Sequence, residues 1–223
     1  MEHDHLIAML NRLKLTAIRD QLDSLIDEAG RRELTIREAL SLFCEREIAT
    51  GRFIANAEAV MLLGPPGVGK THLAVAIGRQ AILTGYSVLF VPAPTLVAQL
   101  AKAHGEGRLE DRLLHFSKPK LLIIDELGYL PFEPNAAHLF FQLVSRRYER
   151  GSILITSNRA VSEWGTVFSD AVVATAILDR LLHHSHVVTI RGDSYRLREK
   201  RRSGLLKAPA ISAPVPTTIA VNA

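Results

Sequence analysis

The stretch GPPGVGKT, residues 64–71, places the strongest constraint on what this chain can fold into. It matches the pattern G-x-x-x-x-G-K-[ST] in full, and a short aliphatic run, VMLL, comes directly before it. A glycine-rich loop between a buried strand and a helix directs backbone N–H groups, and the positive end of the helix dipole, toward phosphate. The stretch therefore predicts a strand–loop–helix unit that binds a nucleoside triphosphate.

The residue types of this loop have separate chemical tasks. Glycines let the backbone wrap around the phosphates. We expect Lys70 to reach the β- and γ-phosphates and the Thr71 hydroxyl to ligate Mg²⁺. The residues predicted to hold the nucleotide are Gly64, Pro65, Pro66, Gly67, Val68, Gly69, Lys70, Thr71 and His72.

The chain after Glu58 alternates short aliphatic runs with helical patterns. The runs are apolar throughout rather than at every second position, which is typical of strands buried on both faces. This order predicts an α/β fold with a parallel sheet covered by helices on both faces. The predicted strands are 60–63, 87–91, 121–125, 152–158 and 186–192, and the predicted helices include 71–85, 94–107 and 136–151.

The chain divides into three parts by pattern. Residues 1–50 predict a small helical module, with apolar residues at helical spacing from Leu6 to about Ile26 and a second helix, IREALSLFCEREI, behind a Thr35 capping box. The apolar stripe of this module is suited either to self-packing or to docking a partner protein. Residues 51–207 form the nucleotide-binding core, and 208–223, which are uncharged and rich in Pro and Ala, predict a disordered tail.

Composition limits the cellular setting. The sequence has no run near the roughly 18 apolar residues that cross a bilayer, and its acidic start differs from a secretory signal. The single cysteine, Cys44, cannot form an internal disulfide, which fits a reducing compartment. We therefore expect a cytoplasmic protein without a membrane partner. The strip 191–207 carries seven basic and two acidic residues, which suits either a polyanion such as DNA or a solvated tail.

Two adjacent acids end the aliphatic run LLIIDE. An acid at the carboxyl end of a parallel strand can reach the Mg²⁺ beside the loop, so Asp125 is a predicted metal ligand together with Thr71. Glu126, one residue on, can activate water for attack on the γ-phosphate. Because water would compete with the acceptor of a small-molecule kinase, this pair favours hydrolysis.

Two further residues are candidates for the reaction. Asn158, which ends the strand-like run SILITSN, can hydrogen-bond the γ-phosphate and the attacking water, although Ser-Asn is also common turn chemistry. Arg180, in ILDRLL, is suited either to reach a neighbouring subunit's nucleotide or to pair with an acid such as Asp179 on the helix surface. The histidines of HHSH, residues 183–186, lack a fourth ligand for a tetrahedral metal site.

Four stretches together resemble the IstB family of AAA+ ATPases, the helpers of insertion-sequence transposition. They are LLGPPGVGKTHLAVAIG, LLIIDELGYLPF, ILITSN and DRLLHHSHVVTIRGDSYR, and the likeness extends from Leu6 to about Leu206. IstB is similar in turn to the bacterial replicative helicase loader DnaC. The resemblance implies a five-stranded AAA+ core, a small N-terminal helical domain and no full C-terminal lid.

The resemblance also implies roles and partners. It implies ATP as the nucleotide, Arg180 as a finger acting in trans, and Arg196 as a second sensor of the γ-phosphate. It implies an ATP-dependent homo-oligomer, binding of double-stranded DNA, and delivery of a target site to an IstA-type transposase. The candidate DNA contacts are the basic strip and the core residues Lys102, Arg146, Arg147 and Arg150.

This sequence departs from the family in one place. Family members carry a longer connection between the N-terminal helices and the first core strand, with a Phe-rich segment beside the adenine, whereas here the run 44–63 joins them almost directly. The pattern indicates an internal loss of several tens of residues. Three alternatives stay open: a DnaC-like helicase loader, a P-loop small-molecule kinase, and a non-hydrolysing scaffold from a degenerate insertion-sequence copy.

Overall fold

The computed structural model describes residue 7 and residues 16–33, 52–129, 132–191, 194 and 218–222. The second predicted helix of the N-terminal module, Cys44, Arg196 and nearly all of the basic strip lie outside these residues. None of the helices in the described part of the chain combines the length and the apolar composition that crossing a membrane requires.

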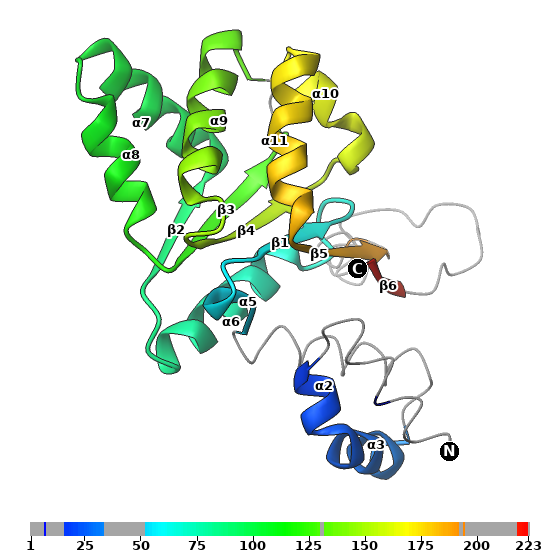
Figure 1. The fold of residues 1–223 in the computed structure, drawn as a ribbon. Helices are drawn as coiled ribbons and strands as arrows, with labels where there is room; N and C mark the ends of the chain where they lie inside the picture. The colour runs from blue at the N-terminus through cyan, green and yellow to red at the C-terminus, as the bar shows by residue number, and fades with distance from the viewer. Residues whose placement is uncertain are drawn as a thin grey trace, which may run out of the picture.

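A six-stranded sheet with the order β2-β3-β4-β1-β5-β6 forms the centre of the core (Figure 1). The first five strands in this order are parallel to one another, so the predicted five-stranded parallel sheet is confirmed. The strands are β1 Ala59–Leu63, β2 Val88–Pro92, β3 Leu121–Leu127, β4 Ser152–Ser157, β5 Ser185–Arg191 and β6 Thr218–Asn222.

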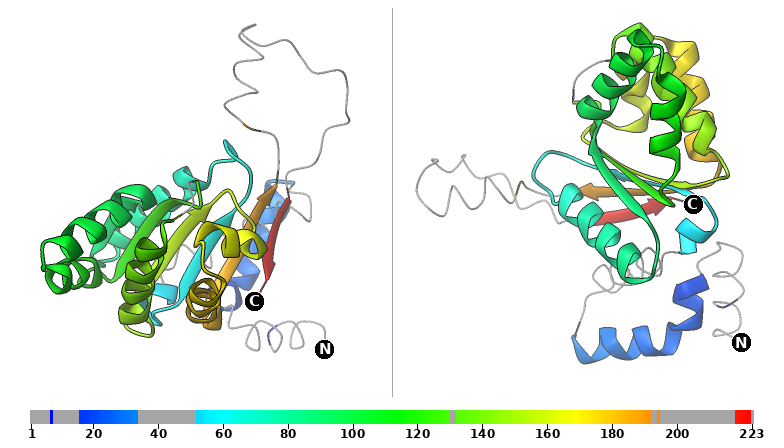
Figure 2. Two further views of the ribbon diagram at one scale, coloured as in Figure 1. Left: turned by 90° about the horizontal axis from the view of Figure 1, so that it is seen from above. Right: turned by 90° about the vertical axis from the view of Figure 1, so that its left-hand side faces the viewer.

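Helices cover both faces of this sheet, as the right-hand view in Figure 2 shows. One face carries α5 and α6, and the other carries α7 to α11 (Figure 1). The bounds are α5 Arg52–Ala55, α6 Lys70–Leu83, α7 Ala93–Gly105, α8 Leu109–Ser117, α9 Pro134–Arg147, α10 Trp164–Val167 and α11 Ala171–His183, with a 3-10 turn, η1, at Val161–Glu163.

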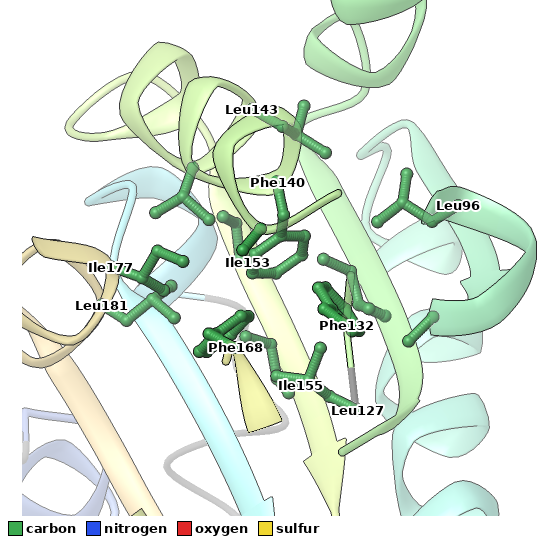
Figure 3. Packing of buried hydrophobic residues seen from close by; sticks show 14 of the residues in the cluster. Leu96, Leu127, Phe132, Phe140, Leu143, Ile153, Ile155, Phe168, Ile177 and Leu181 are labelled. Carbon is green, nitrogen blue, oxygen red and sulfur yellow. The ribbon is translucent and has the colours of Figure 1, made fainter. Parts of the chain in front are cut away.

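Alternate residues of each central strand enter two separate cores. In β1, Met61 and Leu63 pack with α7 to α11, whereas Val60 and Leu62 pack with α5 and α6. This explains why β1 is apolar at every position. In the larger core, the ring of Phe132 meets that of Phe168 edge to face at a centroid distance of 5.2 Å (Figure 3). That contact fixes the loop before α9 against α10.

Arg147 is a structural residue of the larger core rather than a DNA contact. Its side chain is 1% exposed. Its Nη1 donates to the carbonyl oxygen of Phe116 at 2.8 Å, and its Nη2 donates to that of Ser152 at 2.8 Å. Burial lowers the pKa of Arg147 to about 10. The prediction that Arg147 contacts DNA is wrong, because its guanidinium is occupied inside the protein.

The N-terminal module contains α2 (Thr16–Asp20) and α3 (Leu22–Arg31), which replace the single helix predicted up to Ile26. A break at Gln21 separates them, and α3 continues through Gly30. The apolar stripe of the module is buried at Ile18 of α2 and at Leu22 and Leu25 of α3. This stripe is thus covered at these positions within the chain itself, which supports self-packing.

A strand replaces part of the predicted disordered tail. Residues 218–222 form β6, which pairs antiparallel with β5 and sets Val221 opposite Val188. The expectation of disorder rested on the lack of charge and the Pro and Ala content. It is wrong at this point because β-branched residues favour a strand and because β5 would otherwise leave its outer backbone groups unpaired.

Candidate nucleotide-binding site

A cleft of about 740 Å³ lies at the carboxyl ends of β1, β3 and β4. Its volume falls within the range of about 300–1,000 Å³ that is typical of small-molecule sites. The carboxyl edge of a parallel sheet is also where such folds bind ligands. The lining residues are Pro66, Gly67, Val68, Gly69, Lys70, Thr71, His72, Glu126, Tyr129, Thr156 and Asn158.

The loop between β1 and α6 takes a shape that only glycine permits at two positions. Gly64 has a φ of 148°, and a β-carbon there would lie 2.1 Å from the carbonyl oxygen of Ile190. Gly67 has a φ of 83°, and a β-carbon there would lie 2.1 Å from Ser194 Oγ. Helix α6 begins at Lys70, directly behind this loop. The loop and the N-terminus of α6 thus line the cleft, and N–H groups of such a loop and helix end can bind phosphate.

Lys70 places its ammonium group within the loop. Its Nζ donates to the carbonyl oxygen of Gly64 at 2.7 Å and to that of Pro65 at 2.8 Å. Burial lowers the pKa of Lys70, and the charges of Asp125 and Glu126 oppose that shift. The lysine is thus a cation held beside the loop by carbonyl oxygens.

The two predicted metal ligands meet although 54 residues separate them in the sequence. Thr71 Oγ1 donates to the buried Asp125 carboxylate, with distances of 3.0 and 3.1 Å to its two oxygens. Hydroxyl and carboxylate oxygens are the donor types that Mg²⁺ prefers. The donor set therefore fits a Mg²⁺ ion held by Thr71 and Asp125.

Glu126 points into the same cleft from a strained backbone. Its φ is 62°, which is unusual for a residue other than glycine, and its side chain is exposed. The register of β3 against β4 shifts between Ile124 and Leu127, so Glu126 lies within a β-bulge. Asn158 lines the cleft just beyond β4. The structure thus brings Glu126 and Asn158 together with the phosphate loop.

Sequence analysis missed two residues of this cleft. Thr156 Oγ1 donates to Asp125 Oδ1 at 2.5 Å and accepts a hydrogen bond from the backbone N of Glu126 at 2.9 Å. Tyr129 lines the cleft with a side chain that is 65% exposed. The sequence does contain one indication of Thr156. It lies near the carboxyl end of β4, and β4 is next to β3, which carries the two acids.

Arg180 lies away from the cleft of its own molecule. It lies near the end of α11 and lines a small pocket together with Ala59, the first residue of β1. This pocket is thus at the amino end of β1, whereas Lys70 comes after the carboxyl end of that strand. Its Nη1 donates to the carbonyl oxygen of Ala176 at 3.2 Å. The structure therefore does not bring Arg180 to the cleft of its own subunit.

The histidines from the last residue of α11 onward have contacts that the sequence analysis did not foresee. His186 Nε2 lies 2.8 Å from Glu58 Oε2. Exposed ligand atoms of Glu149, His183 and His184 lie within 4.8 Å of one another. A tetrahedral metal site has four ligands, and these three residues would supply three of them.

Comparisons with solved structures show the fold. The chain is similar to a crystal structure of the DnaC helicase loader, with a TM-score of 0.59 and 21% identity over 70% of this chain and 92% of that chain. It is also similar to the crystal structure of DnaI, with a TM-score of 0.58 and 24% identity over 66% of this chain and 83% of that chain. Both likenesses show that the α/β core shares the fold of these proteins.

Comparisons by sequence show the family. A protein of insertion sequence IS21 from Pseudomonas aeruginosa, named for ATP binding, is 42% identical over 240 positions, which cover 89% of this chain and 91% of the relative. Because 240 positions exceed the 223 residues of this chain, the relative carries residues that have no counterpart here. A protein of IS5376 from Geobacillus stearothermophilus, also named for ATP binding, is 54% identical over 70% of this chain.

The chain spans 62% of the length of the IS5376 relative. The model of the family described as IstB-like ATP binding protein matches residues 35–203, which include the phosphate loop, the acid pair and Asn158. This protein belongs to the IstB-like ATP binding protein family.

Proposed function

We propose that this protein is an ATP-dependent, DNA-binding AAA+ ATPase that assembles on target DNA and assists a partner transposase in insertion-sequence transposition. The observation that carries the proposal is that Lys70 and Thr71, at the start of α6, meet Asp125 and Glu126 of β3 at the cleft. The insertion-sequence names of the relatives support the biological role.

The cleft fits ATP with Mg²⁺. The N–H groups of the loop and the Lys70 ammonium would bind the phosphates, and Thr71 with Asp125 would hold the metal. When bound, Mg²⁺ neutralises negative charge on the β- and γ-phosphates. The buried position of Asp125 keeps this carboxylate in place for that task.

Hydrolysis to ADP and phosphate would depend on Glu126. Its exposed carboxylate lines the cleft, so it can accept a proton from a water molecule that attacks the γ-phosphate. Asn158, on the same wall, can orient that water through its amide. A carboxylate in this place favours an ATPase over a kinase, whose acceptor would have to compete with water.

Assembly of a homo-oligomer would complete the site. Because Arg180 lies near the amino end of β1, it can reach a nucleotide only in a neighbouring copy. A neighbour's Arg180 would then supply positive charge to the γ-phosphate in the transition state. ATP binding would thus favour the assembled form, and hydrolysis would dismantle it.

Double-stranded DNA and an IstA-type transposase are the proposed partners, in the cytoplasm. Lys102 and Arg150 are exposed on the core, and the strip 191–207 adds further positive charge. Such contacts would bind phosphates without reading the base sequence. No DNA bond need be broken by this chain, since the transposase would carry out strand transfer.

Light scattering on the purified full chain tests the proposal. We expect ATP with a short duplex DNA to produce a large complex in the wild type, and the same complex to persist longer in Glu126→Gln. Lys70→Ala should form none, because it lacks the cation for the phosphates. A chain that remains monomeric with ATP and DNA in all three proteins would refute the assembly mechanism.

A further inference from the structure

We infer that Thr156 is a positioning residue that directs Asp125 toward the metal and Glu126 toward the attacking water. The inference rests on the proposed ATPase activity and deepens it. Thr156 lies on β4, one strand away from the acids, and its side chain is fully buried. It would act on the reaction only through its two neighbours.

The first argument is the register of β3 against β4. Ile124 pairs with Ile155, and Leu127 pairs with Ser157. Two residues of β3, Asp125 and Glu126, therefore lie opposite the single residue Thr156. A β-bulge of this kind bends its strand and can re-aim a side chain next to a site. Here one acid becomes buried and the other is exposed in the cleft.

The second argument is the hydrogen bonding of the Thr156 hydroxyl. It donates to Asp125 Oδ1 at 2.5 Å and accepts from the backbone N of Glu126 at 2.9 Å. A hydroxyl has one donor and two acceptor sites, so it can make both bonds at once. Because Thr156 is 0% exposed, water cannot easily take its place. One hydroxyl thus links the predicted metal ligand to the predicted base.

The third argument is what each bond maintains. The bond to Asp125 Oδ1 adds to the bonds that the carboxylate accepts from Thr71, so two hydroxyls hold it in place. The other bond gives the backbone N–H of Glu126 an acceptor. Because Glu126 has a φ of 62°, its N–H is not placed to make the regular hydrogen bond of a β-sheet. Loss of the hydroxyl would therefore loosen the metal ligand and release the strained base together.

The neighbouring hydroxyl provides a matched control. Ser157 is also 0% exposed, and its Oγ donates to the carbonyl oxygen of Leu127 at 2.7 Å and accepts from the backbone N of Arg159 at 3.1 Å. It closes the same bulge but bonds neither acid side chain nor the backbone N of Glu126. Ser157→Ala therefore removes a buried hydroxyl of the same strand without touching the link that Thr156 makes.

The test is steady-state ATP hydrolysis by the full chain with duplex DNA, measured against ATP and Mg²⁺ concentration. We expect Thr156→Val to lower kcat by about tenfold or more, as loss of a group that supports a metal ligand typically does. The KM for ATP should change much less, because the phosphate loop is intact, and more Mg²⁺ should be needed for half-maximal rate. Thr156→Ser should restore kcat, and Ser157→Ala should keep it even if its melting temperature falls.

Two results would overturn the inference. One is a kcat for Thr156→Val close to that of the wild type, and the other is an equal loss in Ser157→Ala, which would indicate a general packing effect. If Thr156→Val does not fold by circular dichroism, Thr156→Ala replaces it. Glu126→Gln separates the two claims: if it hydrolyses ATP at the wild-type rate, the proposed activity fails, whereas an inactive Glu126→Gln beside an active Thr156→Val refutes only the role of Thr156.

Discussion

The guanidinium carbon of Arg180 lies 4.6 Å from the centre of the Phe141 ring. Phe141 belongs to α9 and Arg180 to α11, so the contact joins two helices on one face of the sheet. A guanidinium over an aromatic face is attracted to it and restricted in orientation. The contact therefore restricts the orientation of Arg180, the residue that the proposed function assigns to a neighbouring subunit's nucleotide.

Replacement of Phe141 by leucine should weaken this arrangement. We expect Phe141→Leu to lower the ATP hydrolysis rate of the assembled protein by about threefold, in line with a contact worth about 0.5–1 kcal/mol. Affinity for a fluorescent ATP analogue in the monomer should stay unchanged, and Phe141→Tyr should retain the rate. An unaltered rate in Phe141→Leu would show that the ring does not position Arg180.

The ATP affinity should depend on pH through Lys70. Burial lowers the pKa of Lys70 from its usual 10.5, so the ammonium loses its proton earlier than a free lysine as the pH rises. Since the phosphates bind the charged form, affinity should begin to fall at a lower pH than it would with a lysine of the usual pKa of 10.5. Titration of a fluorescent ATP analogue checks this, with Lys70→Arg as a control that keeps its charge. Equal pH profiles for the two proteins would contradict the prediction.

Stability should depend strongly on Arg147 and weakly on Arg150. Arg147→Ala would leave buried carbonyl oxygens of Phe116 and Ser152 without donors, at a cost of roughly 3 kcal/mol or more in unfolding free energy. Arg150 is exposed, so Arg150→Ala should change stability by less than about 0.5 kcal/mol. Urea unfolding measures both, and similar midpoints would argue against a structural role for Arg147.

The salt dependence of DNA binding should decrease when basic residues are removed from the strip 191–207. Replacing Lys200, Arg201 and Arg202 by alanine should weaken binding of any duplex sequence. The slope of log affinity against log salt should fall by about 0.9 for each DNA phosphate that the variant no longer neutralises. Fluorescence anisotropy at several salt concentrations measures this slope. If the slope is the same as in the wild type, the strip does not bind DNA, and exposed core residues such as Lys102 would be tested next.

The sequence was most informative where a motif is local. The loop 64–71 and the pair Asp125 and Glu126 were predicted because spacing, strand and helix all lie within a few residues of them. The meeting of Thr71 with Asp125 also followed, since the carboxyl ends of parallel strands share one edge.

Features that depend on two distant segments were missed. The bulge opposite Thr156 arises from the register between β3 and β4, which neither strand determines alone. The sequence suggests that Arg147 is a surface residue at a helix end. Its burial is favourable because carbonyl groups at the end of α8, in the loop after it and in β4 accept hydrogen bonds from its guanidinium. Strand β6 depends on the free edge of β5. Helix α8 went unpredicted because Gly105 and Gly107 mark the end of α7, and no helix was assigned beyond them.

The central claim is that ATP is hydrolysed between two subunits, with Arg180 acting on a neighbour's nucleotide. The most direct measurement is the ATPase rate of Lys70→Ala mixed with Arg180→Ala, each inactive alone, in the presence of duplex DNA. The account predicts that the mixture regains activity, because an Arg180→Ala subunit supplies an intact cleft and a Lys70→Ala neighbour supplies the arginine. Lys70→Ala forms no complex alone, but it should join Arg180→Ala subunits that have bound ATP. If the mixture remains as inactive as its components although light scattering shows that Lys70→Ala has joined this complex, Arg180 does not act in trans and the account is contradicted.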